Sequence, residues 1–281
     1  MTNQTWRKQT WPAPAKINLF LHIVGQRADG YHLLQTAFQF LTLADELTFS
    51  PADTLQVEGD LSGVTMEQNL VYRAASTLKQ HSTIAQGCHI AIKKRIPDGA
   101  GLGGGSSDAA TTLLALNKYW QCHLSLQQLC EIGVKLGADI PVFVQGHAAW
   151  AEGIGEKLTT ISPPEPYYLV AVPDVKIATP EIFTDKSLTR DSPLRKMHTT
   201  FFEDCRNDCE PVARRRYPQV DNLLNWLNQF APARMTGTGS AIFAPFESEA
   251  DALHAFDAKP DQCQAFVTKG KNLSQTVDFL K

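Results

Sequence analysis

The stretch Pro97-Asp-Gly-Ala-Gly-Leu-Gly-Gly-Gly-Ser-Ser-Asp-Ala-Ala110 is the most informative part of this chain. Five of the seven residues from Gly99 to Gly105 are glycine, so their backbone N–H groups can turn toward an anion and approach it closely. A strand-like segment, Cys88 to Ile96, precedes the stretch, and a helix-like segment, Ser107 to Trp120, follows it. An anion bound here would lie at a helix N-terminus, where the helix dipole favours negative charge. We therefore expect a phosphate-binding loop.

The sequence of this stretch matches some known phosphate-loop patterns and not others. A Walker A loop requires a lysine before its Ser or Thr, and this loop has none. Gly99, Gly101 and Gly104 fit the dinucleotide pattern Gly-x-Gly-x-x-Gly, but no acidic residue occurs between Asp108 and Glu131 to bind a ribose. A dinucleotide fold therefore stays open as the weaker alternative.

A flexible glycine linker is disfavoured because helix-capping residues follow the glycines directly. We expect Ser106 or Ser107 to cap the helix, with Asp108 in its first turn.

A lysine lies in an apolar segment near the start of the chain. Residues 15–24 (AKINLFLHIV) alternate in the manner of a strand, with Ile17 and Leu19 on one face and Asn18 and Phe20 on the other. A lysine buried in such a strand requires an anion or a carboxylate nearby. Lys16 is therefore a candidate site residue, although for this segment taken alone a lysine on an edge strand is the favoured explanation.

Two further segments have the composition of a site. Asp139 follows a predicted helix and precedes the apolar residues of Ile-Pro-Val-Phe-Val, where a carboxylate requires a partner unless it caps a turn. Residues 235–240 (MTGTGS) form a second glycine-containing segment, which alone would indicate only a tight turn.

The composition is that of a globular protein without a strong charge bias. The 281 residues are 43% hydrophobic, and 26 Lys and Arg against 29 Asp and Glu give a net charge of −3. This balance argues against a general nucleic-acid-binding protein, so the basic clusters 93–95 and 214–216 are interpreted as solvated edges. No segment approaches the roughly 18 apolar residues of a membrane span, and no signal peptide is evident. We expect a cytoplasmic protein that binds neither nucleic acid nor membrane.

The six cysteines form no CxxC pair and are expected to be reduced. Cys205, Cys209 and His198 lack a second ligand pair at a recognisable spacing, so we expect no metal site built from protein side chains.

The order of predicted elements indicates two mixed α and β domains. The proline-rich segment 163–166 separates them, which gives domains 1–163 and 164–281. Apart from the segments above, capping residues, periodicity and breakers predict helices at 70–78, 126–136, 207–217, 220–230 and 247–258, and strands at 168–172, 241–246 and 263–269.

The four segments around Lys16, Gly99 to Ser107, Asp139 and Thr236 to Ser240, in this order, resemble the motifs of the GHMP small-molecule kinases. Gly25-Gln-Arg-Ala-Asp-Gly-Tyr-His32 and Leu136-Gly-Ala-Asp-Ile-Pro141 are similar to the members that act on 4-diphosphocytidyl-2-C-methyl-D-erythritol. The resemblance covers nearly the whole chain. It implies an α+β, two-domain fold: an N-terminal ribosomal-protein-like βαβ domain for ATP binding and catalysis, and a C-terminal ferredoxin-like, substrate-binding domain.

The resemblance also implies a reaction. ATP, with Mg²⁺, would phosphorylate the 2-hydroxyl of this cytidine diphosphate sugar alcohol in the non-mevalonate isoprenoid pathway. Asp139 would be the general base, and Lys16 would pair with it and stabilise the developing oxyanion. The ATP site implied by the resemblance comprises Pro97, Asp98, Gly99, Ala100, Gly101, Leu102, Gly103, Gly104, Gly105, Ser106 and Ser107 for the phosphates, and Asn69 and Lys94 for the nucleoside.

The implied acceptor site binds the cytosine through Tyr31 and His32, with Phe183 on the other side of the base, and the sugar alcohol near Phe38. The remaining implied substrate residues are Asn18, Thr179, Gly237 and Gly239. Asp98 departs from the family pattern, and its negative charge should weaken ATP binding unless it faces solvent.

Three alternatives remain at this point. A sibling kinase for mevalonate, homoserine or galactose would have no reason for Tyr31 and His32. A nucleotide-binding module without catalysis would not bring Lys16 and Asp139 together. A dinucleotide-binding protein would bind NAD. We expect a monomer or a weak homodimer.

Overall fold

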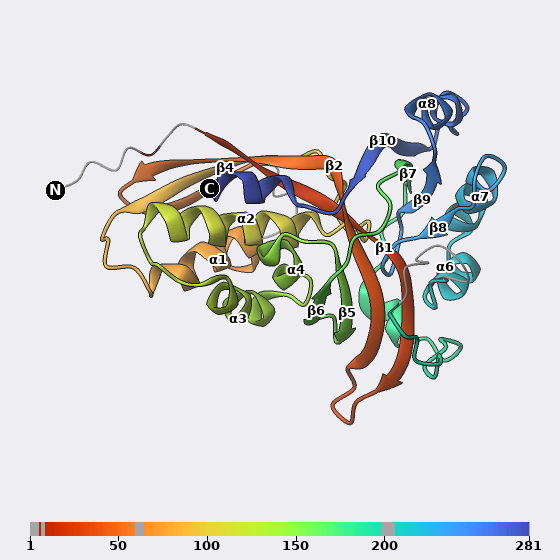
Figure 1. Cartoon of the computed structure of the whole chain (residues 1–281), viewed down its shortest axis with the longest axis horizontal. Helices are drawn as coiled ribbons and strands as arrows, with labels where there is room; N and C mark the ends of the chain where they lie inside the picture. Colours follow the sequence, from red (N-terminus) through yellow and green to blue (C-terminus); the bar gives the residue numbers. More distant parts are fainter. Residues whose placement is uncertain (1–5, 7–8, 60–64, 198–205, 281) are drawn as a thin grey trace.

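The computed structural model describes residues 6, 9–59, 65–197 and 206–280. Its strands form a mixed sheet that runs through the whole molecule, and the helices cover it in two groups, one in each half of the chain (Figure 1). Two long strands organise it: β1 (Thr10–Gln26) and β2 (His32–Ala52) form an antiparallel hairpin.

The first half of the chain packs four helices on one face of its strands (Figure 1). β3 pairs in parallel with β4 through the crossover helix α1, whereas β4 and β5 pair antiparallel with β2. The elements are β3 (Leu55–Glu58), a 3-10 turn (Met66–Gln68), α1 (Leu70–Lys79), β4 (Gly87–Lys93), α2 (Gly104–Tyr119), α3 (Leu126–Leu136), α4 (Ile140–Gln145), β5 (Ala149–Gly153) and β6 (Lys157–Thr160).

The second half adds antiparallel strands in the order β10-β7-β9-β8. Its elements are β7 (Tyr167–Pro173), α5 (Thr179–Phe183), α6 (Glu210–Arg216), α7 (Pro218–Leu227), β8 (Arg234–Met235), β9 (Ile242–Phe246), α8 (Glu249–Asp257) and β10 (Cys263–Lys271). β10 also pairs with β2, at Gly270 with Leu41 and Lys271 with Phe40, so the two halves share one sheet. A last 3-10 turn, Gln275–Phe279, returns to β1, where Thr276 Oγ1 donates to the Pro12 carbonyl at 2.7 Å.

The predicted helices and strands are present in this order, and most differ from the prediction only at their ends. The start of α2 is an exception, since Gly103, at φ +74°, is the residue before the helix and Gly104 begins it. The predicted caps Ser106 and Ser107 and the predicted first-turn position of Asp108 are therefore wrong. The reason is packing: a Cβ on Gly103 would lie 2.9 Å from the Phe143 ring, so the glycine alone lets the helix start this close to its neighbours.

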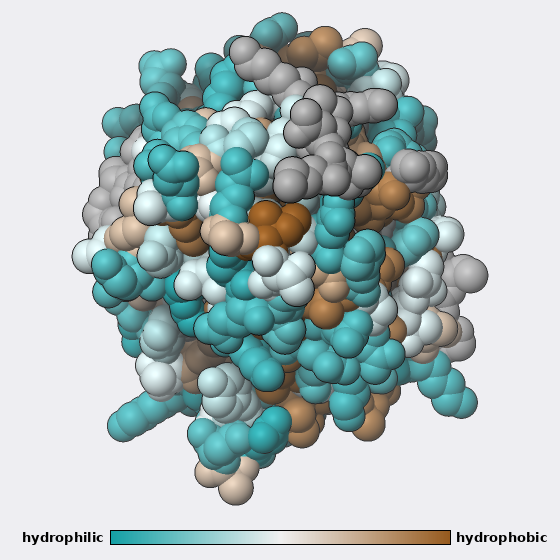
Figure 2. All heavy atoms as spheres, turned by 90° about the vertical axis from the view of Figure 1, so that its left-hand side faces the viewer, coloured by the Kyte–Doolittle hydropathy of each residue, from teal (hydrophilic) through white to brown (hydrophobic). Residues whose placement is uncertain are grey.

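Apolar residues are dispersed on one face of the molecule (Figure 2). On the face at the left-hand end of Figure 1, hydrophobic side chains appear as small separate patches among hydrophilic ones (Figure 2). None of the helices in the described part of the chain is long and apolar enough to cross a membrane.

Candidate active site

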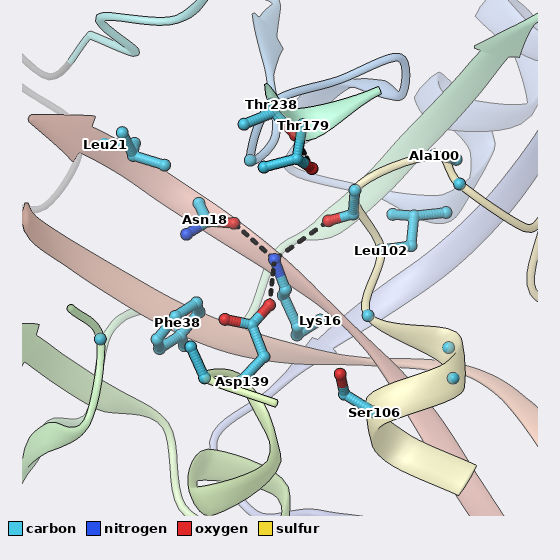
Figure 3. A pocket seen from close by; sticks show the side chains of 18 of the residues that line it. Lys16, Asn18, Leu21, Phe38, Ala100, Leu102, Ser106, Asp139, Thr179 and Thr238 are labelled. Carbon is cyan, nitrogen blue, oxygen red and sulfur yellow. Dashed lines mark hydrogen bonds and ion pairs between the residues drawn. The ribbon is translucent and has the colours of Figure 1, made fainter. Parts of the chain in front are cut away.

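A cavity of about 440 Å³ lies where β1, β2, the glycine loop, the start of α4 and the C-terminal glycine turn meet (Figure 3). The predicted site residues that line it are Lys16, Asn18, Phe38, the loop from Pro97 to Ser106, Asp139, Thr179, Phe183 and Gly237. Tyr31, His32, Asn69, Lys94, Ser107 and Gly239 are not part of this lining. Segments far apart in the sequence thus surround one cavity.

Lys16 lies at the centre of the cavity and is only 3% exposed. Its ammonium donates to Asn18 Oδ1 at 2.7 Å and to the Gly101 carbonyl at 3.0 Å, and it forms an ion pair with Asp139 Oδ2 at 3.3 Å (Figure 3). The Phe38 ring lies beside it, 5.3 Å from Nζ to the ring centroid. The buried charge is therefore fully partnered, as burial requires.

Asp139 combines an ion pair with access to the cavity. It precedes α4 in the capping position but makes no capping hydrogen bond, so its side chain is directed to Lys16 instead. That side chain is 35% exposed, in contrast with the buried ammonium. A carboxylate that is held by a lysine and still open to the cavity is suited to accept a proton from a bound molecule.

Hydrogen bonds to Thr36 and Thr236 fix the position of Asn18. Its amide nitrogen donates to Thr36 Oγ1 at 2.9 Å, and its backbone N–H donates to Thr236 Oγ1 at 2.8 Å. Asn207 Nδ2 donates to the carbonyls of Met235 and Gly237 on both sides of Thr236. The C-terminal glycine turn therefore positions the strand that carries Lys16.

The glycine loop packs against that same turn. Gly101 has φ +77°, and a Cβ there would lie 2.6 Å from the Thr236 carbonyl oxygen. The Ala100 carbonyl accepts from Ala241 N–H at 3.0 Å, and the Leu102 carbonyl accepts from Lys16 N–H at 2.9 Å. These contacts hold the loop open at the N-terminus of α2, which is a suitable place for a phosphate.

Below the loop, α2 is anchored by a buried ion network. Lys94 Nζ contacts Asp45 Oδ2 at 2.6 Å and Asp108 Oδ2 at 2.8 Å. Asp45 also accepts from the backbone N–H groups of Arg95 and Ile96, which is why β4 ends at Lys93 and not at the predicted Ile96. Burial, only partly offset by Lys94, raises the pKa of Asp108 to about 7.

Lys94 corrects one prediction. Its side chain is largely buried, whereas Lys93 and Arg95 are exposed, so the interpretation of this cluster as a solvated edge is wrong for Lys94. The strand ends there, and the lysine turns inward to the two carboxylates.

Asn69 likewise has a structural role: its Oδ1 caps α1 by accepting from the N–H groups of Val71 and Tyr72.

The predicted base-binding residues lie beside the cavity. His32 and Phe183 stack on each other with ring centroids 4.9 Å apart and an interplanar angle of 23°, whereas Tyr31 is 61% exposed. Burial, with a contribution from Arg190, lowers the pKa of His32. Thr179 and Thr238 share a hydrogen bond at 3.0 Å above Lys16 (Figure 3).

Sequence reasoning missed three residues that support the site: Thr36, Asp45 and Arg190. Asp45 was detectable as part of the acidic pair Asp45-Glu46 in an otherwise largely apolar segment. Thr36 and Arg190 carry no local signal, because their partners are distant in sequence.

Of the cysteines considered for a metal site, Cys209 is a buried free thiol, while Cys205 and His198 lie outside the described residues. Within the described ranges no group of three His, Cys, Asp or Glu side chains is arranged to hold a metal ion.

Comparisons with known proteins identify families and individual proteins that this chain resembles. Residues 69–147 match the GHMP kinases N terminal domain, and residues 192–263 match the GHMP kinases C terminal family. A protein of Nitrosococcus oceani named 4-diphosphocytidyl-2-C-methyl-D-erythritol kinase is 52% identical over 273 residues, which covers 96% of this chain and 98% of the relative. A protein of Pseudomonas paraeruginosa with the same name is 53% identical over 265 residues, 94% of either chain.

A solved structure is also similar. The crystal structure of a 4-(cytidine 5'-diphospho)-2C-methyl-D-erythritol kinase superposes with a TM-score of 0.82 at 32% identity, covering 93% of this chain and 99% of that one.

Proposed function

From the premise that this chain belongs to the 4-diphosphocytidyl-2-C-methyl-D-erythritol kinases of the GHMP kinase family, we propose that Lys16 and Asp139 form its catalytic centre. The enzyme is an ATP-dependent kinase that phosphorylates the 2-hydroxyl of 4-diphosphocytidyl-2-C-methyl-D-erythritol, a step of non-mevalonate isoprenoid synthesis. The observation that carries the catalytic assignment is the ion pair of 3.3 Å between these side chains in a cavity bordered by the glycine loop.

The two residues have different tasks in this proposal. The partly exposed Asp139 carboxylate takes the proton of the acceptor hydroxyl. The hydroxyl oxygen attacks the γ-phosphorus of ATP, and the bond between the γ-phosphorus and the oxygen of the ADP leaving group breaks. Lys16 lies 3.3 Å from the carboxylate of the base, where its ammonium would stabilise negative charge that develops on the attacking hydroxyl oxygen. Because phosphoryl transfer depends mainly on positioning and electrostatics, this arrangement meets its principal demands.

The glycine loop and the start of α2 form the proposed ATP-phosphate site, comprising residues 97–107. Backbone N–H groups around Gly103 to Ser106 would bind the phosphates, and the loop conformation leaves room for them. The Ser106 hydroxyl lines the same cavity as Asp139, so oxygen donors suitable for Mg²⁺ are present beside the phosphates. When bound, Mg²⁺ would neutralise charge on the phosphate oxygens. Asn69 and Lys94 remain the proposed nucleoside-binding residues.

The acceptor occupies the other end of the cavity in this proposal. Phe38 borders the sugar alcohol inside the cavity, and the cytosine binds at the edge of the cavity, where Phe183 lines it and Tyr31 and His32 lie outside the lining. The remaining residues proposed to contact the acceptor are Asn18, Thr179, Gly237 and Gly239. Residues 1–163 would then supply ATP binding and catalysis and residues 164–281 substrate binding. We further propose that the enzyme is cytoplasmic and acts as a monomer or a weak homodimer.

ADP release from Mg-ATP with 4-diphosphocytidyl-2-C-methyl-D-erythritol as acceptor tests the base assignment in wild type and Asp139→Asn. The variant should bind ATP normally and lose about 10²- to 10⁴-fold in kcat, the usual contribution of a general base. Asp98→Asn is the matched control, because it makes the same change in another carboxylate of the cavity lining and should retain its turnover.

Full activity of Asp139→Asn would remove Asp139 from the base role. Turnover of mevalonate by the wild type, with none of the cytidine substrate, would instead overturn the acceptor assignment.

A further inference from the structure

Arg190 joins the two aromatic residues proposed to bind the base. Its Nε–H donates to His32 Nε2 at 3.2 Å, and one Nη donates to the Phe183 and Asp185 carbonyls, each at 2.9 Å. The other Nη donates to the Leu188 carbonyl at 3.1 Å. Four acceptors thus fix the orientation of the planar guanidinium, and with it the position of the His32 ring edge.

This contact determines which nitrogen of His32 carries the proton. An arginine has N–H donors and no acceptor, so Nε2 must offer its lone pair and the proton must be on Nδ1. A histidinium has no lone pair to offer, which makes the contact incompatible with the charged ring. Burial beside Arg190 lowers the pKa of His32 and so favours the same neutral form.

The other surfaces of the His32 ring are also constrained. Phe183 stacks on it at 4.9 Å between centroids, and Phe183 itself lines the cavity. In the described part of the chain, no residue accepts a hydrogen bond from Nδ1. The imidazole therefore has one N–H donor in a fixed orientation, on a ring that stacks on the cavity-lining Phe183.

We propose that Arg190 is a positioning residue that makes the site specific for cytosine over uracil, by holding His32 as a donor at Nδ1. This inference rests on the proposed role of His32 in reading the base. Cytosine has an acceptor at N3, which can pair with that donor. Uracil carries a hydrogen on N3, so its N–H donor would face the N–H donor of His32 and neither would have an acceptor.

The test compares kcat/KM for the cytidine diphosphate substrate and its uridine diphosphate analogue in wild type and Arg190→Met. Wild type should prefer cytidine by at least about tenfold, the usual effect of one unsatisfied buried donor. Arg190→Met should lose most of this preference, because the histidine can then move its proton to Nε2. kcat with the cytidine substrate should change much less than the ratio.

Arg215→Met is the matched control for a general loosening of the segment that contains Asp185 and Arg190. Arg215 donates to the Asp185 carboxylate at 2.9 Å, so it supports the same segment without touching His32. The control should keep the cytidine preference. If Arg215→Met and Arg190→Met reduce the preference equally, Arg190 acts only by holding the loop and the proposal is wrong.

A second readout uses ¹⁵N NMR of histidine-labelled wild-type protein, with His32→Asn to assign the signals. The proposal requires a protonated Nδ1 and an unprotonated Nε2, and the reverse tautomer overturns it even if Arg190→Met does not fold. If the enzyme turned over neither substrate, the proposed function would fail, while the tautomer would still decide whether Arg190 orients His32.

Discussion

Asp98 is the residue at which the glycine loop departs from the expected motif, and its surroundings determine how much its charge weakens ATP binding. Its side chain is 58% exposed and lies 3.9 Å from the Lys94 ammonium. An exposed carboxylate is screened by water and salt, and the nearby lysine offsets part of its charge. Asp98 is therefore largely exposed at the border of the cavity, so its charge is expected to weaken ATP binding only slightly.

We predict that Asp98→Met tightens ATP binding by no more than about twofold at physiological salt, since exposed charges contribute only a few tenths of a kcal/mol. Isothermal titration of wild type and variant with ATP measures this. Tightening of tenfold or more would mean that the carboxylate faces the phosphates.

A site residue could be predicted from the sequence only where its immediate neighbours mark it as unusual. Lys16 and Asp139 were singled out because each is a charge in an apolar segment, and the structure brings them together. The buried network of Asp45, Lys94 and Asp108 was missed, because its members are on three elements and nothing in the sequence pairs them.

Helices were predicted well where a capping residue precedes them in the sequence. The predicted helices 70–78 and 126–136 each follow a capping residue, Asn69 and Ser125, and both side chains accept from backbone N–H groups of the helix. The start of α2 was predicted incorrectly, because glycines at 103–105 have low helix propensity and only their packing against Phe143 and Ile96 makes this the helix start.

The cap of α1 allows the two roles of Asn69 to be separated. Asn69→Ala should lower the free energy of unfolding by about 1 kcal/mol through the lost cap. Asn69→Asp keeps the capping oxygen but removes the amide donors, so it should retain stability and raise KM for ATP if Asn69 binds the nucleoside. Urea unfolding and initial-rate kinetics give both quantities.

Ser125→Ala removes a cap of the same kind from α3 and serves as the control, with lower stability and an unchanged KM for ATP. If Asn69→Asp also leaves KM unchanged, capping is the whole role of Asn69.

At the scale of the molecule, the main feature absent from the prediction is β2. This strand pairs with β1, β4, β5 and β10 and is buried on both faces along much of its length. Such a strand has no simple alternation of polar and apolar residues, so periodicity did not reveal it. The shared sheet could not be predicted either, because the pairing of β2 with β10 joins residues more than 200 positions apart.

Gln39 stabilises this junction and offers a test of whether the two halves unfold together. Its amide nitrogen donates to Pro164 O and Asn272 Oδ1, each at 2.9 Å, and its oxygen accepts from Tyr168 O–H at 2.7 Å. Gly270 permits this approach, because a Cβ there would lie 2.9 Å from the Tyr168 ring. All three partners belong to the segment from residue 164 onward, so a single side chain of β2 holds both halves.

We predict that Gln39→Leu destabilises the protein by about 1–3 kcal/mol, because it leaves the buried Tyr168 hydroxyl without its acceptor and removes two partly buried hydrogen bonds, to Pro164 and Asn272. Tyr168→Phe removes one of these groups, so in a double-mutant cycle the pair should show a coupling of about 1 kcal/mol. Urea unfolding, followed by tryptophan fluorescence and by far-UV circular dichroism, should give one coincident transition for wild type, since the sheet is continuous. Additive effects of the two substitutions, or separate transitions in the wild type, would show that the junction does not couple the halves.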